Sequence, residues 1–161
     1  MIVRHAIAEE RDGLRWPDDA ERPLTEAGAE RFARAARGLA RLVPDVDAML
    51  SSAAARAWQT AELLERDAGW PAPEPCDALA VGRAAEAVLA ALPGRGFAAV
   101  VGHEPQLSEL ASLLLAGDSD AAAIELKKGG AVLLACKFGA LPGRAVLRWS
   151  ASPRLLRGLA R

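Results

Sequence analysis

The segment "FAAVVGHEPQLSELASLLLAG" (97–117) decides the fold class, because it joins a strand to a helix with almost no linker. The apolar run within 97–103 has the length and composition of a buried strand. Pro105 then stands at a helix-start position, and Gly117 follows the last residue of the helical pattern. The segment therefore predicts a strand followed directly by a helix, which is the repeating unit of an α/β fold.

The rest of the chain repeats this alternation of strands and helices. The predicted strands are 1–3, 46–52, 97–103, 131–138 and 144–150, with a further short strand near 73–79. The predicted helices are 25–44, 54–69, 83–92 and 105–117. The segment "GALPG" (139–143) has turn residues at both ends, so the last two strands are expected to form a hairpin. The alternation predicts a three-layer α/β/α sandwich with a mostly parallel sheet.

The composition predicts one globular domain, 1–161. The chain has a net charge of −1, with 52% hydrophobic and 25% charged residues, so it has no general attraction to nucleic acid or to an acidic membrane. No apolar run could span a bilayer and no basic-then-apolar leader is present, so a cytoplasmic protein is expected. Cys76 and Cys136 lack metal-site spacing and are expected to be reduced structural thiols.

The two histidines of the chain, His5 and His103, each follow a predicted strand. In α/β sheets, ligands bind at the carboxyl ends of the strands. Arg4 precedes His5, Arg22 lies just before the first helix, and Arg56 lies in the first turns of the second helix. Arginine forks and a helix N-terminus bind phosphate, and a neutral histidine can attack phosphorus. These residues together predict a phosphate site at this edge of the sheet.

Four motifs give the chain a resemblance to a known family. In order they are "IVRHA" (2–6), "RPLTEAG" (22–28), "SSAAARAWQTAELL" (51–64) and "VVGHEPQLSEL" (100–110). They resemble the histidine phosphatase superfamily, which has the phosphoglycerate mutase-like fold, and within it the small SixA-type phosphohistidine phosphatases. The resemblance covers nearly the whole chain and follows the order and approximate spacing of the family.

The resemblance implies a covalent mechanism without a metal or another cofactor. His5 would be the nucleophile, and water would hydrolyse the resulting phosphohistidine. Arg4, Arg56 and His103 would form the phosphate pocket, and Arg22 would close it, as in the SixA-type branch. In-line phosphoryl transfer needs mainly positioning and positive charge around the equatorial oxygens, which agrees with these residue types.

Two further residues are expected to contact the substrate. Gly102 would let the backbone come close to the anion, and Glu104 follows His103 directly. The larger phosphomonoesterases of the family carry an acidic proton donor in an insertion that is missing here. In the corresponding region, Asp77 and Glu86 match no motif of the family. A placed general acid is therefore not evident from the sequence.

Two polar segments are expected to have no part in the site. Asp18, Asp19 and Glu21 are predicted to form a solvated loop. The tail 152–161 has basic and leucine residues at helical spacing, and it is predicted to be a frayed helix rather than a docking motif.

The resemblance implies that the substrate is phosphohistidine on a protein. In the family, such substrates are histidine-containing phosphotransfer proteins of bacterial signalling or sugar-transport relays, and the product is inorganic phosphate. One alternative is a small-molecule phosphomonoesterase on the same scaffold. The other is a non-enzymatic phosphoprotein-binding module or a phosphohistidine carrier. Carriers are typically helical bundles with an exposed histidine, and the predicted α/β fold argues against one.

Overall fold

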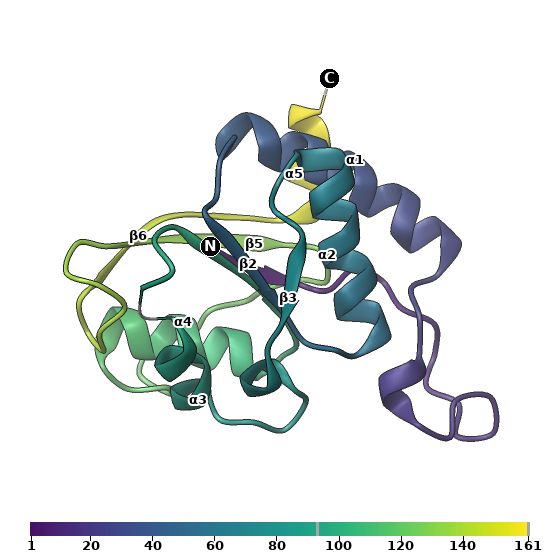
Figure 1. The fold of residues 1–161 in the computed structure, drawn as a ribbon, viewed down its shortest axis with the longest axis horizontal. Coiled ribbons are helices and arrows are strands. Elements are labelled where there is room, and N and C mark those ends of the chain that lie inside the picture. The colour runs from purple at the N-terminus through teal and green to yellow at the C-terminus, as the bar shows by residue number, and fades with distance from the viewer. Residues whose placement is uncertain (93, 161) are drawn as a thin grey trace.

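The computed structural model describes residues 1–92 and 94–160, and in this part of the chain a six-stranded sheet lies between two layers of helices (Figure 1). The strands are β1 (Ile2–Arg4), β2 (Ala48–Ser51), β3 (Pro73–Pro75), β4 (Ala98–Gly102), β5 (Ala131–Cys136) and β6 (Ala145–Ala151). The helices are α1 (Glu26–Leu42), α2 (Ala55–Ala68), α3 (Ala85–Ala91), α4 (Gln106–Ala116) and α5 (Pro153–Leu159). Asp19–Glu21 and Asp77–Leu79 form short 3-10 helices. The predicted three-layer α/β/α sandwich is confirmed.

The sheet is mostly parallel, as predicted. Its strand order is β3-β2-β4-β1-β5-β6. Neighbours among the first four strands are parallel, whereas β5 is antiparallel to both β1 and β6. The predicted hairpin is therefore formed by β5 and β6. The short strand expected near 73–79 is β3, which lies at the sheet edge, where a proline without an N–H is tolerated.

The central strands are buried on both faces, which explains why they read as continuous apolar runs. Met49 and Val101 belong to the core beneath α1, α2 and α5, whereas their neighbours Leu50 and Val100 belong to the core beneath α3 and α4. Successive side chains of a strand point to opposite faces, so each of these central strands contributes to both cores. Figure 1 shows the two helical layers on opposite sides of the sheet.

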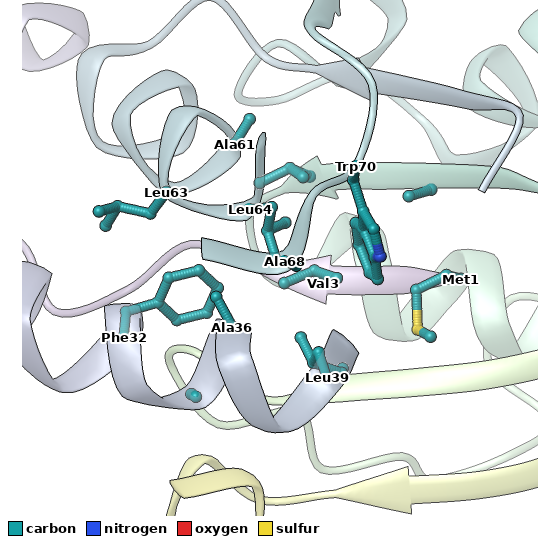
Figure 2. Packing of buried hydrophobic residues seen from close by; sticks show 14 of the residues in the cluster. Met1, Val3, Phe32, Ala36, Leu39, Ala61, Leu63, Leu64, Ala68 and Trp70 are labelled. Carbon is teal, nitrogen blue, oxygen red and sulfur yellow. The ribbon is translucent and has the colours of Figure 1, made fainter. Parts of the chain in front are cut away.

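Helices α1 and α2 meet over the first core. The Thr25 side chain accepts the Gly28 N–H at 2.9 Å and caps α1, as the sequence predicts. Figure 2 shows Phe32 and Leu39 of α1 on the opposite side of Val3 from Leu64 of α2. These four apolar side chains are at most 2% exposed, so burial of this face fixes α1 and α2 against the sheet.

The prediction of a frayed C-terminal helix is wrong. The tail forms α5, which packs on α1, and its Leu156 side chain is fully buried. Gly38 makes this contact possible, because a Cβ atom at Gly38 would lie 1.9 Å from the Leu156 carbonyl oxygen. The backbone of α5 therefore approaches α1 more closely than any side chain at residue 38 would permit.

Gly38→Ala is expected to destabilise the protein by about 1–3 kcal/mol, because the added methyl group overpacks the contact between α1 and α5. Gly158→Ala is the matched control: it lies in α5 with nothing within 4 Å of a Cβ atom, so it should be neutral or stabilising by up to about 1 kcal/mol. Denaturant unfolding measures both changes. Equal stability of the two variants would contradict the close contact.

Within residues 1–92 and 94–160, no helix combines the length and the apolar character that a membrane span requires.

Candidate active site

The two histidines lie together at the carboxyl edge of the sheet. Strands β1 and β4 are parallel neighbours, and Arg4 pairs with Gly102 in register. Each histidine follows its strand directly, and the His5 N–H donates to the Gly102 carbonyl at 3.1 Å. The imidazole ring centres are 5.2 Å apart. Parallel pairing of β1 and β4 therefore brings together two residues that are distant in the sequence.

His5 is held in one tautomer by the backbone. Its Nδ1 lies 2.7 Å from the Ala6 carbonyl oxygen, so Nδ1 carries the proton and Nε2 keeps its lone pair. The backbone at Ala6 is itself held, because the Ala6 N–H donates to Thr60 Oγ1 at 3.0 Å. The Thr60 hydroxyl in turn donates to the Arg56 carbonyl at 2.6 Å within α2. A chain of hydrogen bonds thus orients the His5 ring from α2.

His103 has one nitrogen bonded and one without a partner. Its Nε2 lies 3.0 Å from Ser52 Oγ, which also accepts the Ala54 N–H at 3.3 Å. When the Ser52 hydroxyl donates to Nε2, the proton of the neutral ring resides on Nδ1. Within residues 1–92 and 94–160, this buried Nδ1 has no hydrogen-bond partner. It is therefore free to donate to a ligand.

Arg4 and Arg56 each leave a buried nitrogen unused. Arg56 is only 3% exposed, and its Nη1 donates to the Asp19 carbonyl at 2.7 Å. Arg4 Nη1 donates to the Leu126 carbonyl at 2.8 Å. The Nε atoms of both arginines are buried and have no partner in the described part of the chain. Buried donors without partners are rare and costly, so these nitrogens are well suited to donate to a bound anion.

The Asp19 side chain is 36% exposed, but the expectation that it has no part in the site is wrong, because it contacts two of the site arginines. Its Oδ1 lies 2.9 Å from Arg22 Nε, and its Oδ2 lies 3.1 Å from Arg56 Nη2. Arg22 is 8% exposed, and its Nη1 donates to the Glu9 carbonyl at 2.7 Å. The hydrogen bond from Arg22 and the nearby arginine charges lower the pKa of Asp19, against the effect of burial. Asp18 and Glu21 are exposed, as expected.

Gly102 has a packing role that the sequence did not reveal. A Cβ atom at this position would lie 3.3 Å from Leu79 Cδ2 and 3.4 Å from Leu107 Cδ2. The absence of a side chain at Gly102 therefore leaves room for Leu79 and Leu107 in the core beneath α3 and α4. Its carbonyl group also holds the His5 N–H.

Of the acidic residues considered, Glu104 is half-buried, whereas Asp77 and Glu86 are exposed. Glu104 Oε1 accepts the Ser108 N–H at 3.2 Å in the first turn of α4. Burial raises the pKa of Glu104, although its hydrogen bond to Ser108 and the charge of Arg4 oppose the shift. Glu104 is thus the acid among the three whose environment favours a retained proton.

Burial keeps both histidines neutral. It lowers the pKa of His5 to about 3, the hydrogen bond to the Ala6 carbonyl opposes this shift, and the charges of Arg56 and Arg4 lower the pKa further. It lowers the pKa of His103 to about 4, with Arg56 as the next cause, while Asp19 opposes the shift. At neutral pH, the positive charge of this cluster therefore resides on the arginines, and His5 is an unprotonated imidazole.

NMR titration of the two histidine rings is expected to show both neutral at pH 6, with His5 in the Nδ1–H tautomer. Half-protonation should occur near pH 3 for His5 and pH 4 for His103. Added inorganic phosphate should raise both pKa values, because a nearby anion favours the imidazolium form. Titration of either ring near its ordinary pKa of 6.5 without phosphate would contradict its burial.

The same shifts affect stability against acid. The unfolded chain, with ordinary histidine pKa values of about 6.5, binds more protons than the folded protein as the pH falls toward about 4. The contribution of these histidines to the free energy of unfolding is therefore fully present above pH 6.5. It decreases as the pH falls from 6.5 toward about 4 for His103 and about 3 for His5.

The sequence analysis missed two side chains that support the cluster, Thr60 and Asp19. Thr60 lies within the quoted block at 51–64, where it could have been examined as a partner of the first strand. Asp19 lies three residues before Arg22, which is the spacing of an ion pair on a helical turn. Its pairing with Arg56 has no comparable signal in the sequence.

Comparison with known proteins assigns the chain to a family. Residues 1–80 match the histidine phosphatase superfamily (branch 1). An uncharacterized protein from Picosynechococcus sp. is 35% identical over 137 residues, which cover 81% of each chain.

Several solved structures share the fold. A structure described as SixA from Nakamurella multipartitia is 26% identical, with a TM-score of 0.75 over 94% of this chain and 95% of the other. The protein histidine phosphatase SixA complexed with tungstate gives 0.80 at 23% identity, over 95% and 96% of the two chains. A phosphoserine phosphatase from Entamoeba histolytica gives 0.65 at 14% identity, over 96% and 97%.

The chain belongs to the histidine phosphatase superfamily and has the phosphoglycerate mutase-like fold of the SixA structures. This membership supports phosphatase activity. The solved structures that share this fold include a protein histidine phosphatase and a phosphoserine phosphatase, so the substrate is a separate question.

Proposed function

We propose that this protein is a phosphohistidine phosphatase in which His5 is the nucleophile. One observation carries the proposal: a neutral, oriented imidazole lies with three buried nitrogens that lack partners in the described part of the chain, Arg4 Nε, Arg56 Nε and His103 Nδ1. A phosphoryl group would accept hydrogen bonds from all three. Its substrate would be a phosphohistidine of a phosphotransfer protein in a signalling or transport relay.

In the first step, the lone pair of His5 Nε2 forms a bond to phosphorus, and the P–N bond of the substrate breaks. The departing ring leaves as neutral imidazole if its other nitrogen is protonated. The phosphorylated His5 ring still carries its Nδ1 proton, and this N–H still donates a hydrogen bond to the Ala6 carbonyl. The cationic ring is then a good leaving group, because it departs as neutral imidazole.

In the second step, a water oxygen attacks phosphorus and the bond to His5 Nε2 breaks. The bonding electrons return to Nε2, a water proton is released or stays on the phosphate, and inorganic phosphate leaves. Arg4, Arg56 and His103 stabilise the charge on the equatorial oxygens, and Arg22 adds positive charge at the edge of the pocket. Preorganised donors of this kind supply most of the catalysis in phosphoryl transfer.

A second candidate is a phosphomonoesterase with Glu104 as the proton donor. The observation that favours it is the raised pKa of Glu104, which directly follows His103. An alkoxide leaving group needs such a proton, whereas imidazole is a better leaving group.

The test uses a phosphohistidine protein and a phosphate monoester as separate substrates and measures the release of inorganic phosphate. Preferential turnover of the phosphohistidine protein supports the proposal. Preferential turnover of the monoester would favour the second candidate, and binding without turnover of either would indicate a non-enzymatic module.

A further inference from the structure

We propose that Asp19 is a positioning residue, which holds Arg22 and Arg56 in the geometry that phosphoryl transfer requires. This inference rests on the proposed function. Asp19 acts through the two arginines and need not touch the substrate.

All three oxygens of Asp19 contact guanidinium groups, and the exposed Arg11 adds a further contact, with its Nε 3.3 Å from Oδ1. Oδ1 lies 2.9 Å from Arg22 Nε, Oδ2 lies 3.1 Å from Arg56 Nη2, and the backbone carbonyl accepts Arg56 Nη1 at 2.7 Å. Both terminal nitrogens of Arg56 thus contact one residue, and among the described residues its buried Nε has no partner. Asp19 therefore restrains the orientation of the Arg56 guanidinium group, whose buried Nε can donate to an anion.

Electrostatics explains why this position needs a carboxylate. Arg22 and Arg56 are almost completely buried, and their like charges repel each other. Burial lowers the pKa of Arg56, the Arg22 charge lowers it further, and Asp19 opposes both effects. A buried charge without a partner is costly, so loss of Asp19 would allow the arginines to move apart toward solvent.

Asp19 also ties the loop between β1 and α1 to α2. The ends of this loop are joined by the hydrogen bond from the Glu9 N–H to the Pro23 carbonyl at 3.0 Å. The 3-10 helix that contains Asp19 contacts α2, and Figure 1 shows this loop in purple near one end of α2. The bond from Asp19 to Arg56 thus fixes the loop and the arginines together.

The same contacts permit an opposing interpretation, in which Asp19 is an anionic latch that competes with phosphate for the arginines. The two interpretations predict opposite effects of removing the charge. A positioning residue should be needed for binding and turnover. A competing latch should weaken phosphate binding, so its removal should strengthen binding.

The experiment compares wild-type protein with Asp19→Asn, and with Glu21→Gln as a matched control. Glu21 lies in the same 3-10 helix and is exposed, and its side chain makes no ion pair within the described residues. Calorimetry measures the Kd of inorganic phosphate at fixed ionic strength. Phosphate release from a phosphohistidine protein gives kcat and KM.

For Asp19→Asn, we expect a Kd raised about 10-fold and a kcat lowered at least about 10-fold, which is the scale of one charge-assisted hydrogen bond. NMR should also show that the pKa of His103 is lower in Asp19→Asn than in the wild-type protein, because the wild-type Asp19 charge raises this pKa. Glu21→Gln should change each value less than about 2-fold. Asp19→Glu keeps the charge but displaces it, so its changes in Kd and kcat should be intermediate. This variant replaces Asp19→Asn in the test if Asp19→Asn does not fold.

Tighter phosphate binding by Asp19→Asn with turnover maintained would overturn the positioning role and establish a latch. Unchanged Kd and kcat would also overturn it. If wild-type protein binds phosphate but hydrolyses neither a phosphohistidine protein nor a phosphate monoester, the proposed function is refuted independently of the role of Asp19. In that case, weaker phosphate binding by Asp19→Asn would still support the positioning of the arginines.

Discussion

His5→Ala is expected to lower kcat on a phosphohistidine protein by at least about 10³-fold, the scale of removing a covalent catalytic residue. We do not expect the neighbouring His103 to replace it, because a Ser52 hydroxyl that donates to His103 Nε2 leaves Nδ1 as a donor. Arg4 and Arg56, the proposed phosphate donors, remain in this variant, so phosphate should still bind. The loss should therefore appear in kcat more than in the affinity for phosphate.

The measurement combines single-turnover kinetics with acid-free trapping of phosphorylated enzyme, which should form in wild-type protein and be absent in His5→Ala. Thermal unfolding checks that the variant is folded. Arg31→Ala, on the exposed face of α1, is the control and should retain activity. More than a tenth of wild-type activity in folded His5→Ala would refute the nucleophile assignment.

The second large effect concerns substrate choice. We expect kcat/KM to decrease from phosphohistidine protein to aryl phosphate to alkyl phosphate, with at least about 10²-fold between the ends. Transfer between two imidazoles is nearly balanced in energy. An alkoxide leaves only with help from a proton donor, and general acid catalysis typically contributes about 10²–10⁴-fold.

Steady-state kinetics with a phosphohistidine protein, p-nitrophenyl phosphate and a sugar phosphate measures this order. Equal rates on the first and last substrates would show that a general acid operates. Glu104→Gln is then the decisive variant, because burial raises the pKa of Glu104. Loss of only the alkyl phosphate activity in this variant would establish Glu104 as that acid, with Asp77 and Glu86 as the next candidates.

Sequence reasoning could place the two histidines because their positions follow from local pattern and a general property of α/β sheets. Each histidine ends an apolar run, and the carboxyl ends of parallel strands meet at one edge. The same reasoning located Arg56 through the start of α2. It could not determine which nitrogen of each ring is free, because this depends on the Ala6 carbonyl and Ser52.

The two incorrect expectations concerned segments whose environment is not local. Asp19 reads as one acid among several in a polar loop, yet the fold brings it to Arg56 on α2. The C-terminal tail reads as a short basic helix, yet Leu156 is buried against Gly38. In both segments, the energetically important partner is distant in the sequence.

The sequence by itself determined the order of strands and helices, because hydrophobic periodicity and capping residues act over a few neighbouring positions. Together with the motifs, it determined the phosphate-site candidates His5, Arg4, Arg56 and His103. Only the tertiary structure decided the pairing of Asp19, the position of α5 and the neutral state of both histidines. These features depend on burial and on charges brought close by folding, and neither is encoded in the spacing of residues along the chain.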